Sequence, residues 1–268
     1  MRLQDRAAAD GLQELLVLPP ASALDVCPGC SSWRNPGDPW CHNCQTMRVK
    51  LRSVCHVVIP ISLYARPSAF RDILSRYKDR ADCIDDKMDV LPSDVSQEYC
   101  AQQIRLILNR FLIEVLPRLE AQGQRWDYLT AVPSSWRAGT HPLVTILETL
   151  GVGEVRQPLL RVPGEALAHD QPNERAFEIG APVDGKSILL IDDVLTTGAS
   201  IHSATAALSN AGADVVAGIV IARRVRPEYN KHSHSVWARQ IAQKFQWRIA
   251  AAEGVRQLRR TTSSRSGL

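Results

Sequence analysis

The fold of this chain is decided by the stretch Ile188-Leu189-Leu190-Ile191-Asp192-Asp193-Val194-Leu195-Thr196-Thr197-Gly198-Ala199-Ser200. Its four leading apolar residues predict a buried strand. Two neighbouring carboxylates, Asp192 and Asp193, stand where that strand is expected to end. A hydroxyl-rich loop follows, and a helical pattern then runs from Ser200 to Ala211, with Gly212 as its stop. This order of elements predicts one strand–helix unit of a parallel sheet.

The loop after the two aspartates is suited to holding a phosphate. Backbone N–H groups at a helix N-terminus, with the hydroxyls of Thr196, Thr197 and Ser200, can surround a phosphate dianion. Gly198 lets the backbone approach that group closely. Ligands of open parallel sheets lie beyond the carboxyl ends of the strands, where the acids would accept hydrogen bonds from the vicinal hydroxyls of a ribose. The alternative is an aspartate-capped turn without a ligand, in which burying two carboxylates would cost solvation.

The rest of the chain alternates apolar runs with helical patterns. Further strands are expected at 57–61, 128–133 and 215–222, and helices at 69–77 and 143–150. A long core helix is expected after Asp94, its predicted N-cap, while residues 79–93 are acidic, rich in turn formers and expected to form a loop. Strands alternating with helices predict an α/β fold with a Rossmann-like, doubly wound parallel sheet.

Four of the seven cysteines form two Cys-x-x-Cys pairs, Cys27 with Cys30 and Cys41 with Cys44. The surrounding residues 25–55 show little periodic pattern, so this segment cannot build its own core and needs a metal to fold. Four thiolates at this spacing are typical of a closed, structural zinc site without an open position for activating water. His42, Cys55 and His56 lie close by and leave the exchange of one ligand open.

Composition and charge bound the class of protein. A chain of 268 residues can bury one substantial core and carry a small accessory module. Its 45% hydrophobic content is ordinary for a globular protein, and no apolar run approaches a membrane span, so a cytoplasmic location is expected. The net charge of +4 is uneven, because eleven basic and two acidic residues follow from Arg223 onward. This basic segment favours contact with DNA or another polyanion, and a solvated helix with a tail is the alternative.

Taken together, these features resemble the ComF family of type I phosphoribosyltransferases, named for bacterial competence (DNA uptake) proteins. The opening stretch is similar to the phosphoribosyl-pyrophosphate motif. The apolar segment ending at Pro19-Pro20, the cysteine pairs and the helix Ala69–Lys78 are similar to the N-terminal part of that family. The resemblance spans roughly residues 12–226. It implies a zinc-knuckle module at 1–56, a phosphoribosyltransferase domain at 57–225 and a basic C-terminal helix and tail at 226–268.

The resemblance also implies roles for individual residues. Asp192 and Asp193 would hold the ribose hydroxyls and stabilise the cationic sugar. The 5′-phosphate would lie against the loop residues Thr196, Thr197, Gly198, Ala199 and Ser200. Magnesium is expected with the pyrophosphate, and the candidate pyrophosphate contacts are Ser134, Ser135 and Arg137.

Other polar residues near these loops are weaker candidates for binding phosphate or for acid–base catalysis. Lys78 and Arg161 are candidate phosphate clamps, although isolated cations are more often structural. His141 and His169 are candidate general bases, although a lone loop histidine is usually only solvated.

Two functions fit this pattern. The first is a transferase that moves the phosphoribosyl group to an acceptor. The second is a non-catalytic protein of the same fold that senses the ribose phosphate or serves DNA uptake. The segment Trp136–Pro142 keeps the family's glycine but lacks its second arginine and its Asn-Gln pair. This departure favours the second function, whereas the pair of aspartates favours the first.

Overall fold

The computed structural model describes residues 2–21, 23–78, 90–133, 141–165, 167–168 and 170–263. The elements of the first half are α1 (Leu3–Gly11), η1 (Leu12–Leu15), α2 (His42–Lys50), β1 (Val58–Tyr64), α3 (Ala69–Arg76), α4 (Gln97–Glu120) and β2 (Tyr128–Ala131). Those of the second half are α5 (Pro142–Leu150), β3 (Leu159–Arg161), β4 (Phe177–Ile179), β5 (Ser187–Leu195), α6 (Ala199–Asn210), β6 (Asp214–Arg224), α7 (Lys231–Ile241) and α8 (Trp247–Ser263).

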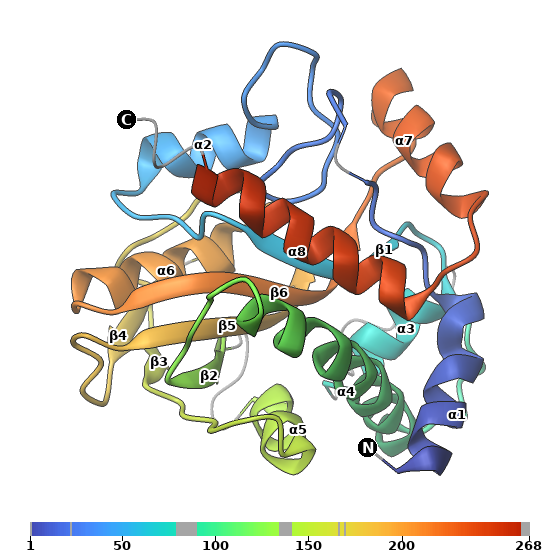
Figure 1. Ribbon diagram of the computed structural model, residues 1–268, viewed down its shortest axis with the longest axis horizontal. Helices are drawn as coiled ribbons and strands as arrows, with labels where there is room; N and C mark the ends of the chain where they lie inside the picture. The colour runs from blue at the N-terminus through green and yellow to red at the C-terminus, as the bar shows by residue number, and fades with distance from the viewer. Residues whose placement is uncertain are drawn as a thin grey trace.

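A four-stranded parallel sheet with the order β1-β6-β5-β2 forms the centre of the molecule (Figure 1). The strands β3 and β4 pair with each other as a separate antiparallel ribbon. All four central strands point the same way, so their carboxyl ends meet at one edge, where loops and ligands of such sheets lie. This topology confirms the α/β fold with a parallel sheet that the alternating pattern predicted.

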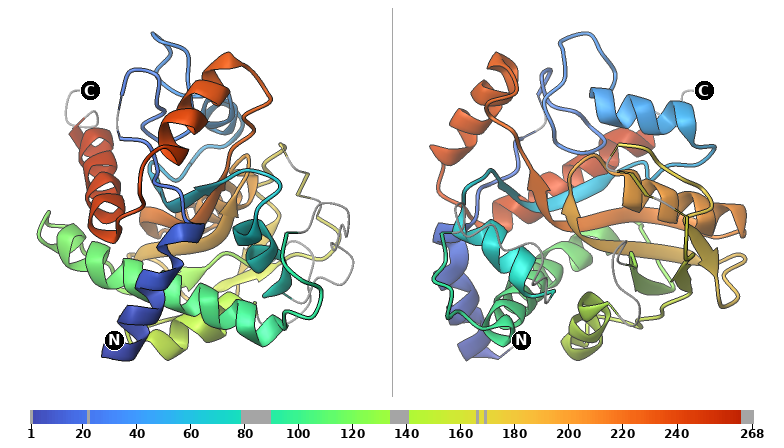
Figure 2. Two further views of the ribbon diagram at one scale, coloured as in Figure 1. Left: turned by 90° about the vertical axis from the view of Figure 1, so that its right-hand side faces the viewer. Right: turned by 180° about the vertical axis from the view of Figure 1, so that it is seen from behind.

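Helices cover both faces of the sheet, with α4 and α8 on one side and α6 on the other (Figures 1 and 2). The apolar positions of α4 that recur at helical spacing are buried, including Ile104, Phe111 and Val115. In α8, Gly254 lies directly against Ile59 of β1, where a Cβ atom would come within 2.4 Å of the isoleucine side chain. Among the described helices, none combines the length and the hydrophobicity needed to cross a bilayer.

The N-terminal cysteine segment docks on the sheet and on α8. The N–H of Val58 donates to the carbonyl of Gly29 at 2.8 Å. The hydroxyl of Ser31 donates to Gln257 Oε1 at 3.1 Å, and Gln257 Nε2 donates to the carbonyl of Val58 at 3.1 Å. Gln257 of α8 therefore joins the cysteine segment to strand β1.

Some boundaries differ from the sequence-based expectations. The strand that was expected to end at Ile191 continues to Leu195, because pairing of β5 with β6 extends through both aspartates. The N-cap of α4 is Ser96, whose hydroxyl accepts from Tyr99 N at 3.1 Å, and not Asp94. Most of the acidic segment expected as a loop, residues 79–89, lies outside the described residues.

Candidate functional site

A partly open cavity of about 150 Å³ lies at the carboxyl end of β5. Its wall includes Asp192 and the whole loop 194–201, and Leu167 and Ala168 close it from the side of the β3–β4 ribbon. The five loop residues that were expected to hold a phosphate therefore face the same space as one of the two acids. The turn is not sealed beneath other side chains.

The loop Thr196–Ser200, called the phosphate loop below, leads directly into the N-terminus of α6. Gly198 has φ 95°, in the left-handed region that favours glycine, and it forms the N-cap of α6 without a capping side chain. The first N–H groups of α6 therefore have no side-chain acceptor at the N-cap, and they point with the positive end of the helix dipole toward the loop. The backbone N–H of Ala199 lies 3.4 Å from Thr197 Oγ1. An anion in the cavity would complete the bonding of this helix end.

The two neighbouring aspartates have different surroundings. Asp193 accepts a hydrogen bond from the Tyr77 hydroxyl at 2.6 Å and forms an ion pair with Lys78. Asp192 instead lines the cavity, and its Oδ1 accepts from the backbone N–H of Asp193 at 2.8 Å. Asp193 is thus committed to the two residues that follow α3, whereas Asp192 faces the space that a ligand would enter.

Burial sets the charge state of Asp192. Removal from water raises the pKa of this carboxyl to about 7, although the nearby Lys78 ammonium acts in the opposite direction. The group therefore changes between its neutral and ionised forms near neutral pH. Sugar hydroxyls donating to the carboxylate would replace the lost water and favour the ionised form.

The His202 side chain of α6 packs against the phosphate loop at Gly198. Its ring packs so closely on Gly198 that a Cβ atom there would lie 2.9 Å from His202 Cδ2. The backbone N–H of Cys55 donates to His202 Nδ1 at 3.2 Å. Burial lowers the pKa of His202 to about 3, so the ring is neutral and accepts this bond at physiological pH. Glycine at position 198 is therefore required both by its φ angle and by this contact.

Several predicted site residues lie elsewhere or are not described. Ser134, Ser135, Arg137 and His169 lie outside the described residues. Arg161 donates to backbone carbonyls of its own ribbon, including Ala176 O. His141 caps α5, with its Nδ1 accepting from Leu143 N at 3.0 Å, which leaves Nδ1 unsuited to general-base chemistry. Lys78 is held by Asp193.

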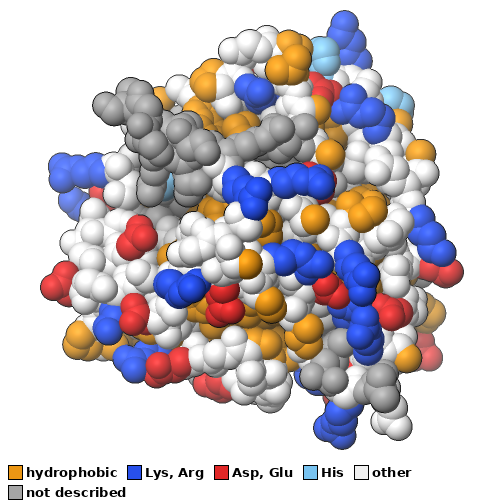
Figure 3. All heavy atoms as spheres, viewed as in Figure 1, with side chains coloured by type: hydrophobic (Ala, Val, Ile, Leu, Met, Phe, Trp, Pro, Cys, Tyr) orange, Lys and Arg blue, Asp and Glu red, His pale blue; other side chains and the backbone are white. Residues whose placement is uncertain are grey.

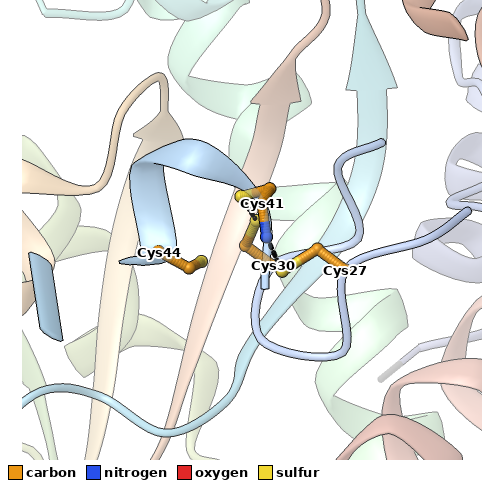
Figure 4. A group of neighbouring side chains, drawn as sticks. All are labelled: Cys27, Cys30, Cys41 and Cys44. Carbon is orange, nitrogen blue, oxygen red and sulfur yellow. Dashed lines mark hydrogen bonds between the residues drawn. The ribbon is translucent and has the colours of Figure 1, made fainter. Parts of the chain in front are cut away.

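The four paired cysteines come together as the sequence predicted (Figure 4). Their sulfur atoms all lie within 4.8 Å of one another, and those of Cys30 and Cys41 are 3.5 Å apart. A tetrahedral zinc–thiolate centre with bonds of about 2.3 Å requires sulfur separations of about 3.8 Å, so the cluster fits such a metal. Cys55 lies outside this set. Burial raises its pKa to about 12, and its thiol donates to Val57 O at 3.1 Å.

A buried cation beside the cysteines supports the fit. Arg223 of β6 is only 3% exposed, and its Nε has no hydrogen-bond partner. Burial opposes its charge, but the neighbouring cysteines raise the pKa of Arg223 above its ordinary value. Four thiolates around a divalent metal carry a net charge of −2, which would compensate the buried guanidinium. The anionic character of the cysteine cluster therefore gives an electrostatic reason for the burial of this arginine.

Three of these residues were not assigned their contacts by sequence reasoning. Tyr77 was expected only as an apolar helix position, and no local signal linked it to Asp193. His202 lay within the predicted helix, and its proximity to Gly198, one turn earlier, is the signal that could have drawn attention to it. Arg223 was counted only as part of the basic C-terminal segment.

Comparison with known proteins supports a phosphoribosyltransferase-like fold. A family model described as phosphoribosyl transferase domain matches residues 163–253, which include β5, the phosphate loop and α6. No curated protein matches the chain significantly. Similar solved structures include adenine phosphoribosyltransferase from Saccharomyces cerevisiae (18% identity, 45% of this chain and 68% of that chain, TM-score 0.33). Another is a phosphoribosyltransferase from Corynebacterium diphtheriae (23% identity, 64% of this chain and 89% of that chain, TM-score 0.28).

Proposed function

We propose that this protein binds phosphoribosyl pyrophosphate at the carboxyl edge of its sheet and transfers the phosphoribosyl group to a nucleophilic acceptor. One observation carries the proposal: Asp192 and the phosphate loop line the same cavity. The 5′-phosphate would lie against the loop and the N-terminus of α6, and the ribose hydroxyls would donate to Asp192. The match to the phosphoribosyl transferase domain covers these same residues.

The chemistry follows from this placement. The bond between ribose C1 and the pyrophosphate oxygen breaks, a bond from C1 to the acceptor forms, and the acceptor loses a proton. The sugar carries positive charge in the transition state, and the ionised carboxylate of Asp192 would stabilise it electrostatically. Asp193 would act through its contacts with Tyr77 and Lys78, which fix the end of the strand. Magnesium, when bound with the donor, would neutralise the leaving pyrophosphate.

We further propose that zinc is the metal of the four cysteines and that the chain is a member of the ComF family. The closed set of thiolates leaves no position for a substrate, so the zinc would be structural. Its role would be to join the two cysteine pairs and so fix the shape of the segment that docks on the sheet.

Titration calorimetry with the donor and magnesium tests donor binding. We expect the double variant Asp192→Asn, Asp193→Asn to lose donor binding by at least tenfold while its fold and zinc content persist. Asp94→Asn, at an exposed carboxylate away from the cavity, serves as the control and should bind as wild type. Equal donor binding by the double variant and wild type would contradict the site.

Turnover is tested separately by donor-dependent pyrophosphate release with a panel of nitrogenous bases. Release that depends on one base would support the transferase. Donor binding without release for any base would leave the second candidate, a non-catalytic protein that senses the ribose phosphate.

The surface favours DNA as a partner of that second candidate. Lys and Arg side chains gather on the face that carries α8 (Figure 3), where Arg248, Arg256 and Arg259 are exposed. We expect a variant with glutamine at these three positions to bind DNA at least tenfold more weakly at 0.1 M salt, with a shallower salt dependence. The exposed Arg156→Gln is the control. Unchanged DNA binding would exclude α8 as the contact.

A further inference from the structure

A second cavity, of about 350 Å³, lies on the α6 side of the sheet, away from the phosphate loop. It is partly open to solvent and is lined by the end of α2, the segment 51–56 that follows it, the C-terminal half of α6 and the start of β6. Ser209 on its wall is ten residues beyond Ala199, which corresponds to about 15 Å along the helix axis. This space, called the basic cavity below, is therefore distinct from the sugar-phosphate cavity.

The wall of the basic cavity is cationic and rich in donors. Arg48, Arg52 and His56 supply positive or potentially positive groups, whereas Asp214 is the single acidic lining residue among those described. The hydroxyls of Ser53 and Ser209 add further hydrogen-bonding groups, whereas the buried Thr205 hydroxyl already donates to the carbonyl of Ile201 at 2.8 Å. This combination of guanidinium, imidazole and hydroxyl groups is the chemistry that recognises a phosphate.

The cavity is preorganised by its surroundings. The guanidinium of Arg48 lies 3.7 Å from the centre of the Trp40 ring, a cation–π contact that fixes its position. The residues Met47, Leu51, Val54 and Ala206 form a small buried apolar cluster that packs α2 and the following segment onto α6. The backbone N–H of Arg52 donates to Glu174 Oε1 at 3.0 Å. The Arg48 guanidinium and the backbone at Arg52 are thus held in place before any ligand arrives.

A short chain of contacts joins this cavity to the phosphate loop. Its wall contains Val54 and His56, and Cys55 between them donates its backbone N–H to His202 Nδ1 at 3.2 Å. The other side of the His202 ring packs on Gly198 of the phosphate loop. Segment 54–56 and the His202 ring therefore form one continuous set of contacts between the basic cavity and Gly198.

We propose that the basic cavity binds a small phosphate-bearing molecule, and that its occupation strengthens donor binding at the phosphate loop through Cys55 and His202. The volume lies at the lower end of the range for small-molecule sites, which limits the ligand to about the size of a pyrophosphate or a mononucleotide. The binding part stands independently, and the coupling part rests on the proposed donor site. By linkage, the donor must in turn strengthen binding in the basic cavity by the same factor.

Calorimetry with inorganic pyrophosphate on the full chain tests the binding part. We expect the donor-site variant Asp192→Asn, Asp193→Asn to retain a pyrophosphate site. In that background, Arg48→Gln with Arg52→Gln should weaken this binding at least tenfold. Ser209→Glu, which adds a negative charge without removing a basic contact, should do the same. Arg125→Gln, at an exposed arginine elsewhere, should bind as its parent.

Two results would overturn the site. One is pyrophosphate binding that is lost entirely in the donor-site variant. The other is binding that is unchanged by both the arginine variants and Ser209→Glu.

The coupling part is tested by donor affinity in the presence of saturating inorganic pyrophosphate, compared between the wild type and Arg48→Gln, Arg52→Gln, because competition at the donor site is the same in both proteins. We expect donor binding to be at least threefold tighter in the wild type under these conditions, and equal in the two proteins without pyrophosphate. Equal donor affinity in the presence of pyrophosphate would refute the coupling. A chain that binds pyrophosphate in the basic cavity but binds no donor would refute the proposed function and leave this site intact.

Discussion

The carboxyl edge of the sheet and the N-terminal cysteine segment both bury a cluster of acidic groups, and each cluster has one buried or nearly buried cation beside it. At the sheet edge the groups are Asp192 and Asp193, with Lys78 as the cation. In the cysteine segment they are four thiols, with Arg223 as the cation. The first cluster opens onto a cavity, whereas the four cysteines are 1–5% exposed and enclosed on all sides.

The difference in exposure determines how easily a bound ligand or ion could leave each cluster. At the sheet edge one acid is satisfied within the protein and the other keeps a face toward solvent, so a ligand can come and go. In the cysteine cluster every sulfur faces its neighbours, so a bound metal would leave only if the segment opened. The open cluster is therefore suited to a ligand that exchanges with solvent, and the closed cluster to an ion that stays bound.

Removing one thiolate should produce the largest effect. We expect Cys30→Ser to reduce zinc from one per chain to none and to lower the free energy of unfolding by about 3 kcal/mol or more, because metal binding and folding of this segment are coupled. Metal analysis and denaturant unfolding measure both quantities. Cys100→Ser, at a buried cysteine outside the cluster, should keep its zinc. A Cys30→Ser protein with a full complement of zinc would contradict the structural metal.

The counter-ion should have an intermediate effect. We expect Arg223→Met to weaken zinc retention by about 10- to 100-fold in competition with a chelator, because the negative thiolate centre loses its buried positive neighbour. Without metal, we expect the Arg223→Met protein to have a larger free energy of unfolding than the wild type, because the substitution removes a buried charge that has lost its counter-charge. Equal zinc retention by the two proteins would show that Arg223 is not the counter-ion.

The smallest effect concerns the pH dependence of the open cluster. The pKa of Asp192 is raised by burial to about 7, so between about pH 4 and pH 7 the folded state holds a proton that the unfolded chain releases. Asp192 therefore reduces stability as pH rises through that window. We expect the free energy of unfolding of Asp192→Asn, relative to that of the wild type, to rise by about 1 kcal/mol or more from pH 5 to pH 8. Asp94→Asn is the surface control, and a difference that does not change with pH would contradict burial as the cause.

Local pattern was sufficient for much of the fold and of both clusters. Three patterns can be recognised from neighbouring residues alone: the apolar run before Asp192, the glycine in the loop and the spacing of the cysteines. Contacts across long separations were not predictable in this way. Tyr77 meets Asp193 only because α3 packs beside the end of β5, and the direction of the Arg223 side chain depends on the register of β6.

The C-terminal segment shows the same limit in another form. Its many basic residues suggested an exposed helix. The structure shows that one side of α8 is apolar and packs on α4 and β1, which the composition did not predict. The buried residues of this side are Trp247, Ala250, Ala251, Val255 and Leu258. Composition averages the two sides of a helix, whereas packing depends on which side each residue occupies.

The bridge from Ser31 through Gln257 to Val58 has a consequence for the order of events during translation. The cysteine pairs leave the ribosome early, but Gln257, which joins their segment to β1, is synthesised 226 residues after Ser31. A nascent chain therefore carries its metal-binding segment incompletely docked until α8 has emerged. A stalled or prematurely terminated product would expose that segment to the quality-control machinery of the cell.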